Sequence, residues 1–359
     1  MTSQSSGTSA PPQVSRLQES IPELLKQHEV AGLAAACVRE GRCEWSGGFG
    51  FADEAGARPV TAETIFEAGS LSKPVSAYCA LQLWERGVLE LDAPLMRYLP
   101  DPFMPNEPRL RVITARMALS HTTGMQGWRE PGAPLRLIAT PGRHFTYSGE
   151  AYVYLQRVVE RLTGQSLDDY ARRNLFEPFG MADSSYAWEE RFETRAARSF
   201  DEAGRIDRSL MWDYAHGAAT PPTASAAADA PELAMPNAAS GLYTTAADYA
   251  RFLVELMRPA AGDEFHLSAR GTDEMLKERI RVGDAIGWGL GWGLQQTARG
   301  DAFFHWADQN SFQHFAIGFR DEQSALVVLT NSVHGLKVCR ALASEFVGAD
   351  LPLFSALAG

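Results

Sequence analysis

Near the start of the chain, the spacing of apolar and polar positions predicts a helix. Apolar side chains recur every three or four positions between Val14 and Leu25. This spacing puts them on one helix face, although Pro22 is expected to kink or restart the helix. Residues 32–38 and 43–51 then flank the short turn Arg39-Glu40-Gly41-Arg42. The pattern predicts a β-hairpin directly after the helix.

Helical periodicity dominates the middle of the chain, and strand-like segments return near its end. Thr245 is expected to cap an amphipathic helix, and a further short helix is expected after Thr272. The other expected helices cover residues 75–86, 115–120, 150–162 and 336–347. The expected late strands cover residues 288–295, 302–306, 312–319 and 325–331.

Because strands cluster at both ends of the sequence and helices lie between them, we predict an α/β (α+β) fold. One antiparallel sheet would be built from both chain ends and flanked by helices, with a helical lobe inserted between them. The expected domain spans 13–350, with a sheet lobe at about 13–80 and 240–350 and a helical lobe at about 81–239. Residues 1–12 and 351–359 are expected to be tails, and 218–236 a loop or lid.

Composition narrows the possible functions. The chain has 359 residues, a net charge of -11 and no run of lysine or arginine, which argues against nucleic-acid and anionic-membrane partners. No stretch has the length of a transmembrane helix, and the first twelve residues lack the apolar segment of a signal peptide. A cytoplasmic location is therefore expected. The four cysteines have no metal-binding spacing and are interpreted as small apolar residues.

The candidate chemistry centres on Ser70 and Lys73, at the start of the expected helix 75–86. Residues three apart share a helix face, so the lysine amine would lie beside the serine hydroxyl. A desolvated lysine can take the proton of a serine and make it a nucleophile. The alternative is a serine that caps the helix beside a solvated lysine. The chain has four lysines against many arginines, which favours the catalytic interpretation because arginine cannot give up its proton.

Further motifs follow in a characteristic order. Tyr147-Ser148-Gly149 and His305-Trp306-Ala307 come after the Ser70-Leu71-Ser72-Lys73 stretch. Taken together, these stretches resemble the penicillin-binding-protein-like serine hydrolases, a superfamily that includes class C β-lactamases and family VIII carboxylesterases. D-amino-acid peptidases and D-alanyl-D-alanine carboxypeptidases also belong to it. The resemblance covers roughly residues 13–350 and implies the β-lactamase/transpeptidase-like fold.

The resemblance implies a role for each matching residue. Ser70 would be the acylated nucleophile, and Lys73 and Tyr147 would share its proton as general base and return it to the leaving group. The backbone N–H groups of Ser70 and Asp308 would form the oxyanion hole. His305 would lie across the site from Lys73. No metal or organic cofactor is expected.

Three positions depart from the family pattern and concern substrate binding. Gly149 stands where the family has an asparagine that binds a substrate amide, and His305 stands where a lysine would bind a carboxylate. Ala307 replaces a glycine on the strand that lies against the substrate, and Trp306 could line the site. Each change weakens recognition of a carboxylated β-lactam or a D-peptide, whereas none removes the acyl-transfer residues.

We therefore predict a serine hydrolase, most simply a carboxylesterase with weak β-lactamase activity at best, that acts on small ester or amide substrates. A β-lactamase, a D-amino-acid amidase or peptidase, an acyltransferase and a catalytically silent ligand-binding domain are the alternatives. Because a second cation beside Lys73 is disfavoured, His305 is expected to be a neutral hydrogen-bond donor. The sequence leaves the acyl group, the leaving group and the oligomeric state open.

Overall fold

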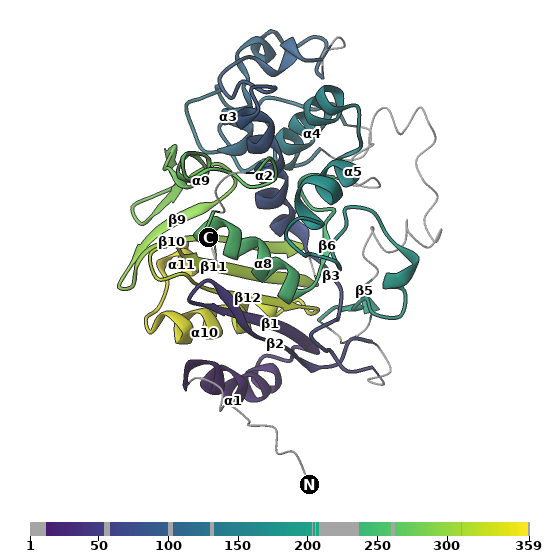
Figure 1. Cartoon of the computed structure of the whole chain (residues 1–359), viewed down its shortest axis with the longest axis vertical. Helices are drawn as coiled ribbons and strands as arrows, with labels where there is room; N and C mark the ends of the chain where they lie inside the picture. The colour runs from purple at the N-terminus through teal and green to yellow at the C-terminus, as the bar shows by residue number, and fades with distance from the viewer. Residues whose placement is uncertain are drawn as a thin grey trace.

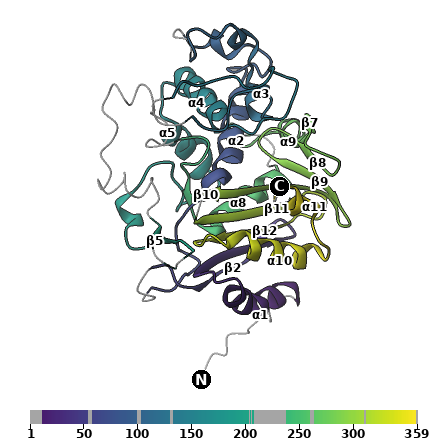
Figure 2. The ribbon, with the colours of Figure 1, turned by 180° about the vertical axis from the view of Figure 1, so that it is seen from behind.

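The computed structural model of the chain describes residues 12–53, 58–99, 103–129, 133–202, 204, 206–207, 237–259, 263–309 and 311–357. Within these ranges a large antiparallel sheet has helices on both faces. A further group of helices lies beyond one of these faces (Figures 1 and 2). The predicted fold class is therefore confirmed. The predicted N-terminal tail and the predicted 218–236 loop or lid fall almost entirely outside the described residues.

The eight strands of the sheet come from the two ends of the sequence and follow the order β2-β1-β12-β11-β10-β9-β8-β7. The join between the two ends is the antiparallel pairing of β1 with β12, for example Leu33 with Thr330. The strands are β1 (Gly32–Arg39), β2 (Arg42–Gly50), β7 (Ile280–Arg281), β8 (Ile286–Trp288), β9 (Gly293–Thr297), β10 (Gly300–Gln309), β11 (Phe312–Phe319) and β12 (Ser324–Thr330).

The two faces of the sheet pack into separate cores, because successive strand side chains point to opposite sides. In β1, Ala34 and Ala36 belong to the core beneath the helical lobe, whereas Leu33 and Ala35 belong to the core on the other face. The second core packs against α1 (Pro12–Gln27), α10 (Gly335–Val347) and α11 (Pro352–Leu357). The first packs against α8 (Ala246–Met257) and the inserted helices.

The inserted helices place a short turn against the sheet. η1 (Gly69–Leu71) leads directly into α2 (Ser72–Glu85), which is buried along nearly its whole length. The other helices of the region are η2 (Leu95–Arg97), η3 (Pro108–Val112), α3 (Ala115–Leu119), α4 (Gly149–Thr163), α5 (Leu167–Ala171), η4 (Arg172–Phe176), η5 (Glu190–Phe192) and α9 (Ala269–Leu276). Two small sheets pair β3 (Phe66–Glu67) with β6 (Tyr243–Thr244), and β4 (Ser199–Phe200) with β5 (Ile206–Asp207).

Several predicted boundaries are wrong for local reasons. α1 continues through Pro22 as one helix, so the helix does not restart there. The single strand predicted at 288–295 is two strands, because the backbone turns at Gly291, whose φ of +92° is in the left-handed region. α9 begins before Thr272, where Ser268 accepts a hydrogen bond from the backbone of Gly271. The predicted C-terminal tail contains α11.

The cysteines and the lengths of the helices bear on two further expectations from the sequence. All four cysteines are free thiols, and Cys43 pairs with Val38 across the hairpin. Cys37, Cys79 and Cys339 are buried, whereas Cys43 is exposed. None of the helices in the described ranges combines the length and the apolar character that a membrane crossing requires.

Candidate active site

Ser70 is held in η1, which lies directly against β10. Gly69 has a φ of +52°, a left-handed conformation that favours glycine. A Cβ atom added at Gly69 would lie 3.0 Å from Oε1 of Gln309 and 3.2 Å from Cβ of Ala307. Glycine at this position therefore lets the backbone before Ser70 approach the strand closely.

Buried polar contacts hold the same turn from the other side. The Ser72 hydroxyl donates to the carbonyl of Gly69 at 2.6 Å and accepts from the N–H of Leu242 at 2.9 Å. The Tyr249 hydroxyl donates to the carbonyl of Leu71 at 3.0 Å. Ser72 is completely buried, so loss of its hydroxyl would leave buried backbone groups without partners. These contacts fix the backbone on either side of Ser70.

The structure brings Ser70, Lys73 and Tyr147 together, as the sequence predicts. The Lys73 Nζ donates to Ser70 Oγ at 3.0 Å and to the carbonyl of Ala239 at 2.9 Å. The hydroxyls of Ser70 and Tyr147 are hydrogen-bonded to each other. The Nζ also lies 4.8 Å from the centroid of the Tyr147 ring. Ser70 thus contacts both groups that could take its proton.

Burial sets the proton affinities of these groups. Lys73 is 1% exposed, and this desolvation lowers its pKa to about 7. Burial raises the pKa of Tyr147, and its hydrogen bond with Ser70 acts in the opposite direction. Both Ser70 and Tyr147 keep partial exposure, so a small molecule can reach the hydroxyl from solvent. Near neutral pH, Lys73 is therefore the residue of the three that can exist as a neutral base.

His305 is fully buried, and its geometry corrects one detail of the sequence-based expectation. Its Nδ1 lies 2.7 Å from the carbonyl oxygen of Trp306, which can only accept, so Nδ1 carries the proton. Burial first, and the nearby Lys73 second, lower the His305 pKa to about 3, which favours the neutral ring. A neutral ring with its proton on Nδ1 presents Nε2 as an acceptor, so the expected donor role toward substrate is wrong. Within the described residues, Nε2 has no hydrogen-bond partner.

Aromatic rings fix the orientation of Tyr147. The His121 ring stacks on it at a centroid separation of 4.2 Å, and Trp306 stacks at 5.8 Å. Trp288 meets it edge-on at 6.1 Å. The Nδ1 of His121 also accepts a hydrogen bond from the N–H of Ser148 at 3.0 Å, which fixes the backbone next to Tyr147. Because burial lowers the His121 pKa far below its usual range, this aromatic wall carries no fixed positive charge.

The remaining predicted residues surround this group but differ in accessibility. Trp306 is half-buried, and Asp308 is exposed with its Oδ1 accepting from Gln313 Nε2 at 3.1 Å. Ala307 is completely buried, and its methyl group faces Gly69. The Ala307 side chain therefore lies beneath the Ser70 turn, where a substrate cannot reach it. Gly149 is also buried.

Two residues of this arrangement could not be identified from the sequence. One is the carbonyl of Ala239, which accepts a hydrogen bond from Lys73 across 166 residues of sequence. The other is the indole of Trp128, which covers Gly149. Both contacts join a helix to a separate segment, whose relative position depends on the tertiary fold. Neither residue has a spacing to the motifs that could have identified it.

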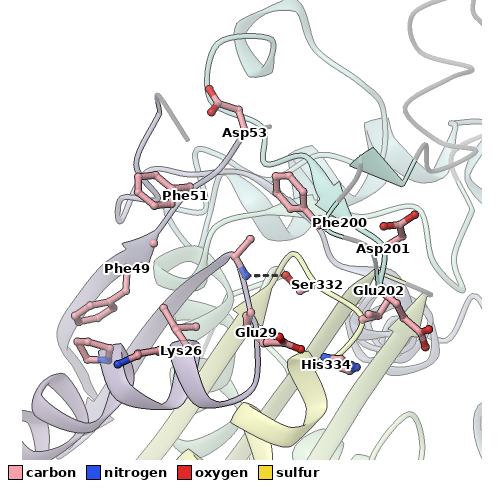
Figure 3. Close-up of a pocket in the computed structure, with 17 residues that line it drawn as sticks. Lys26, Glu29, Phe49, Phe51, Asp53, Phe200, Asp201, Glu202, Ser332 and His334 are labelled. Carbon is pink, nitrogen blue, oxygen red and sulfur yellow. Dashed lines mark hydrogen bonds between the residues drawn. The ribbon is translucent and has the colours of Figure 1, made fainter. Parts of the chain in front are cut away.

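A separate cavity of about 860 Å³ lies apart from the Ser70 group (Figure 3). It lies between the end of α1, the end of β2 and the residues that follow β12, with Phe49, Phe51 and Phe200 among its lining side chains. Its charged lining residues include both Lys26 and carboxylates, and none of the Ser70 group lines it. Among the described residues, no group of three or more His, Cys, Asp or Glu side chains could hold a metal ion.

Comparison with known proteins gives one consistent family. A family model described as Beta-lactamase matches residues 17–345. Esterase EstB of Burkholderia gladioli is 29% identical over 315 residues, which are 77% of this chain and 78% of that protein. Penicillin-binding protein 4 of Amycolatopsis lactamdurans is 29% identical over 221 residues, 57% of this chain and 58% of that protein. The resemblance inferred from the order of the motifs is confirmed.

Solved structures support the same fold. An octameric penicillin-binding protein homologue from Pyrococcus abyssi has a TM-score of 0.75 and 21% identity, and the match covers 94% of this chain and 79% of that one. A β-lactamase/D-alanine carboxypeptidase from Pseudomonas syringae has a TM-score of 0.76 and 18% identity, with 94% and 99% covered. At these identities the likeness establishes the fold.

The Lys73 environment predicts how acylation of Ser70 depends on pH. With the neutral amine as the proposed base, the rate should rise as the amine loses its proton near pH 7 and stay level to about pH 9. The measurement is kcat/KM for an activated ester against pH, in the native protein and in His305→Lys. A falling limb near pH 7 that moves to much higher pH in His305→Lys would contradict the neutral His305.

Proposed function

The chain belongs to the β-lactamase family of serine hydrolases, and on this basis we propose that it is a carboxylesterase working through an acyl-serine at Ser70. The observation that carries the proposal is the 3.0 Å contact between Lys73 Nζ and Ser70 Oγ. Burial holds the pKa of that amine at about 7, so the base is available near neutral pH. The hydroxyl it activates is partly exposed, so an ester can reach it.

In the first half-reaction, Ser70 Oγ attacks the ester carbonyl carbon while its proton moves to neutral Lys73, with Tyr147 sharing it. The carbonyl oxygen becomes an oxyanion, which the backbone N–H groups of Ser70 and Asp308 stabilise. Loss of one such donor typically costs about 3 kcal/mol. The bond to the leaving oxygen then breaks, and the proton passes from Lys73 and Tyr147 to that oxygen.

The second half-reaction uses the same groups in reverse. A water molecule gives a proton to the Lys73–Tyr147 pair and attacks the acyl carbon. The bond between that carbon and Ser70 Oγ breaks, Ser70 regains its proton, and the carboxylic acid leaves. The geometry suits both steps, because the Lys73 amine and the Tyr147 hydroxyl both contact Ser70 Oγ.

The preference for esters follows from the groups that would bind the rest of the substrate. Gly149 offers no side-chain amide, and the rings next to Tyr147 offer no fixed cation for a carboxylate. An ester needs neither contact and has a better leaving group than an unstrained amide. The similarity to an esterase supports the same choice. An amidase, a peptidase or an acyltransferase would share the acyl-serine and differ in the substrate or acceptor.

Labelling with a fluorophosphonate tests the nucleophile. Intact-mass spectrometry should show one adduct on the native protein and none on Ser70→Ala. Lys73→Arg keeps the charge but cannot accept a proton, so its labelling should be slower by a factor on the order of 10²–10⁴. Labelling that persists in Ser70→Ala would refute the assignment. A native protein that takes no label would instead point to a silent ligand-binding domain.

A substrate panel tests the ester preference. We expect kcat/KM to be higher for p-nitrophenyl esters than for nitrocefin and D-aminoacyl anilides, because the amide and carboxylate contacts are missing. Dividing each value by the rate of hydroxide hydrolysis removes the contribution of the leaving group. Nitrocefin cleavage with a kcat/KM above that of every ester would replace the esterase proposal with a β-lactamase.

A further inference from the structure

The indole of Trp128 occupies the space that a side chain at position 149 would need. A Cβ atom added at Gly149 would lie 2.1 Å from Cζ2 of Trp128, and its three nearest atoms would all belong to the indole. A Cβ atom essentially never lies within 3.0 Å of a heavy atom of a residue that is not its chain neighbour. Glycine at 149 and tryptophan at 128 are therefore one structural unit, in which the aromatic ring replaces the missing side chain.

The indole lies on the same side of the backbone as the Tyr147 side chain. Ser148, between Tyr147 and Gly149, is extended, with φ of −143° and ψ of 118°. In an extended backbone, residues two apart point to the same side. Since the Tyr147 hydroxyl is hydrogen-bonded to Ser70, a ring that fills the side-chain position of Gly149 lies on the Ser70 side of this segment.

Hydrogen bonds on both sides of Trp128 fix this arrangement. The N–H of Gly149 donates to the carbonyl of Gly127 at 2.9 Å, and the Ser148 hydroxyl donates to the carbonyl of Gln126 at 2.7 Å. The N–H of Arg129 donates to a carboxylate oxygen of Glu150 at 3.0 Å. The backbone of residues 126–129 is thus bound to the segment that carries Tyr147. The indole nevertheless remains 39% exposed, so part of the ring is free to contact a ligand.

We propose that Trp128 is the specificity-determining wall of the site and binds the apolar acyl group of the ester substrate. This inference rests on the proposed esterase function. The oxyanion hole takes one oxygen of the tetrahedral carbon, and Lys73 and Tyr147 return a proton to the other, so the acyl chain is the substituent left to contact an apolar surface on the Ser70 side, which the indole supplies. A partly exposed indole gives a large apolar contact, and its one N–H can donate to an amide carbonyl but nothing on it can accept from an amide N–H. The substrate class is therefore esters with an unsubstituted alkyl or aryl acyl group.

The first test varies the acyl chain while p-nitrophenol remains the leaving group. Each methylene that becomes buried is worth up to about fourfold in kcat/KM, so the native protein should prefer the butyrate to the acetate by up to about 15-fold. Trp128→Ala should lose most of this preference, and Trp128→Phe should keep part of it. Trp45→Ala is the matched control, because Trp45 is a partly exposed tryptophan on β2, at the sheet edge distant from β10.

The outcomes separate this inference from the esterase proposal. Fluorophosphonate labelling of Trp128→Ala shows that its Ser70 machinery is intact. An unchanged preference in a labelled Trp128→Ala variant, or no preference for the longer acyl chain in the native protein, overturns the role of Trp128 while ester hydrolysis stands. A native protein that neither takes the label nor hydrolyses any ester overturns the proposed function itself.

A double substitution tests the same unit from the other residue. Gly149→Asn alone places its side chain against the indole and should lower ester hydrolysis more than tenfold. Combining it with Trp128→Ala removes the obstruction and supplies an amide, so the double variant should recover ester hydrolysis. Relative to Trp128→Ala, it should also gain in the ratio of nitrocefin to acetate kcat/KM. Equal losses in the single and double variants would contradict the steric coupling of the two positions.

Discussion

The proposed chemistry depends on one physical constraint, which is the burial of a lysine amine that has no acidic partner among the described residues. Lys73 is almost completely buried, and its amine contacts the Ser70 hydroxyl and the carbonyl of Ala239. Desolvation is the cause of its lowered pKa. A carboxylate beside the amine would hold the lysine protonated, so that the amine could not act as a base. The apolar surroundings of α2 are thus a requirement of the proposed mechanism as well as part of the core.

The sheet and the helical lobe must meet accurately for this constraint to act on Ser70. The Ser70 turn rests on β10 through Gly69, while Tyr147 is presented from the loop before α4. The aromatic rings around Tyr147 then fix its hydroxyl against Ser70. These contacts come from three separate stretches of sequence. The fold therefore supplies the proximity, and in the proposed mechanism the buried lysine takes the proton.

Much of this could be predicted from the sequence, where local rules determine the structure. The i, i+3 relation of Ser70 and Lys73, the hairpin and the two-ended sheet all follow from periodicity and spacing. The turn at Gly291 and the continuous helix at Pro22 could not, because the surrounding packing decides them. The position of the proton on His305 depends on its contact with one backbone carbonyl. The packing of Trp128 against Gly149 joins two separate segments of the chain. Such contacts leave no periodic signal.

The central claim is that burial gives Lys73 a neutral amine near pH 7, and its proton titration can be measured directly. The chain has only four lysines, so ¹³C-labelled lysine gives few side-chain NMR signals, and Lys73→Arg identifies the signal of interest. We predict that the Lys73 signal titrates near pH 7. A Lys73 signal that remains that of a protonated amine well above neutral pH would contradict the account.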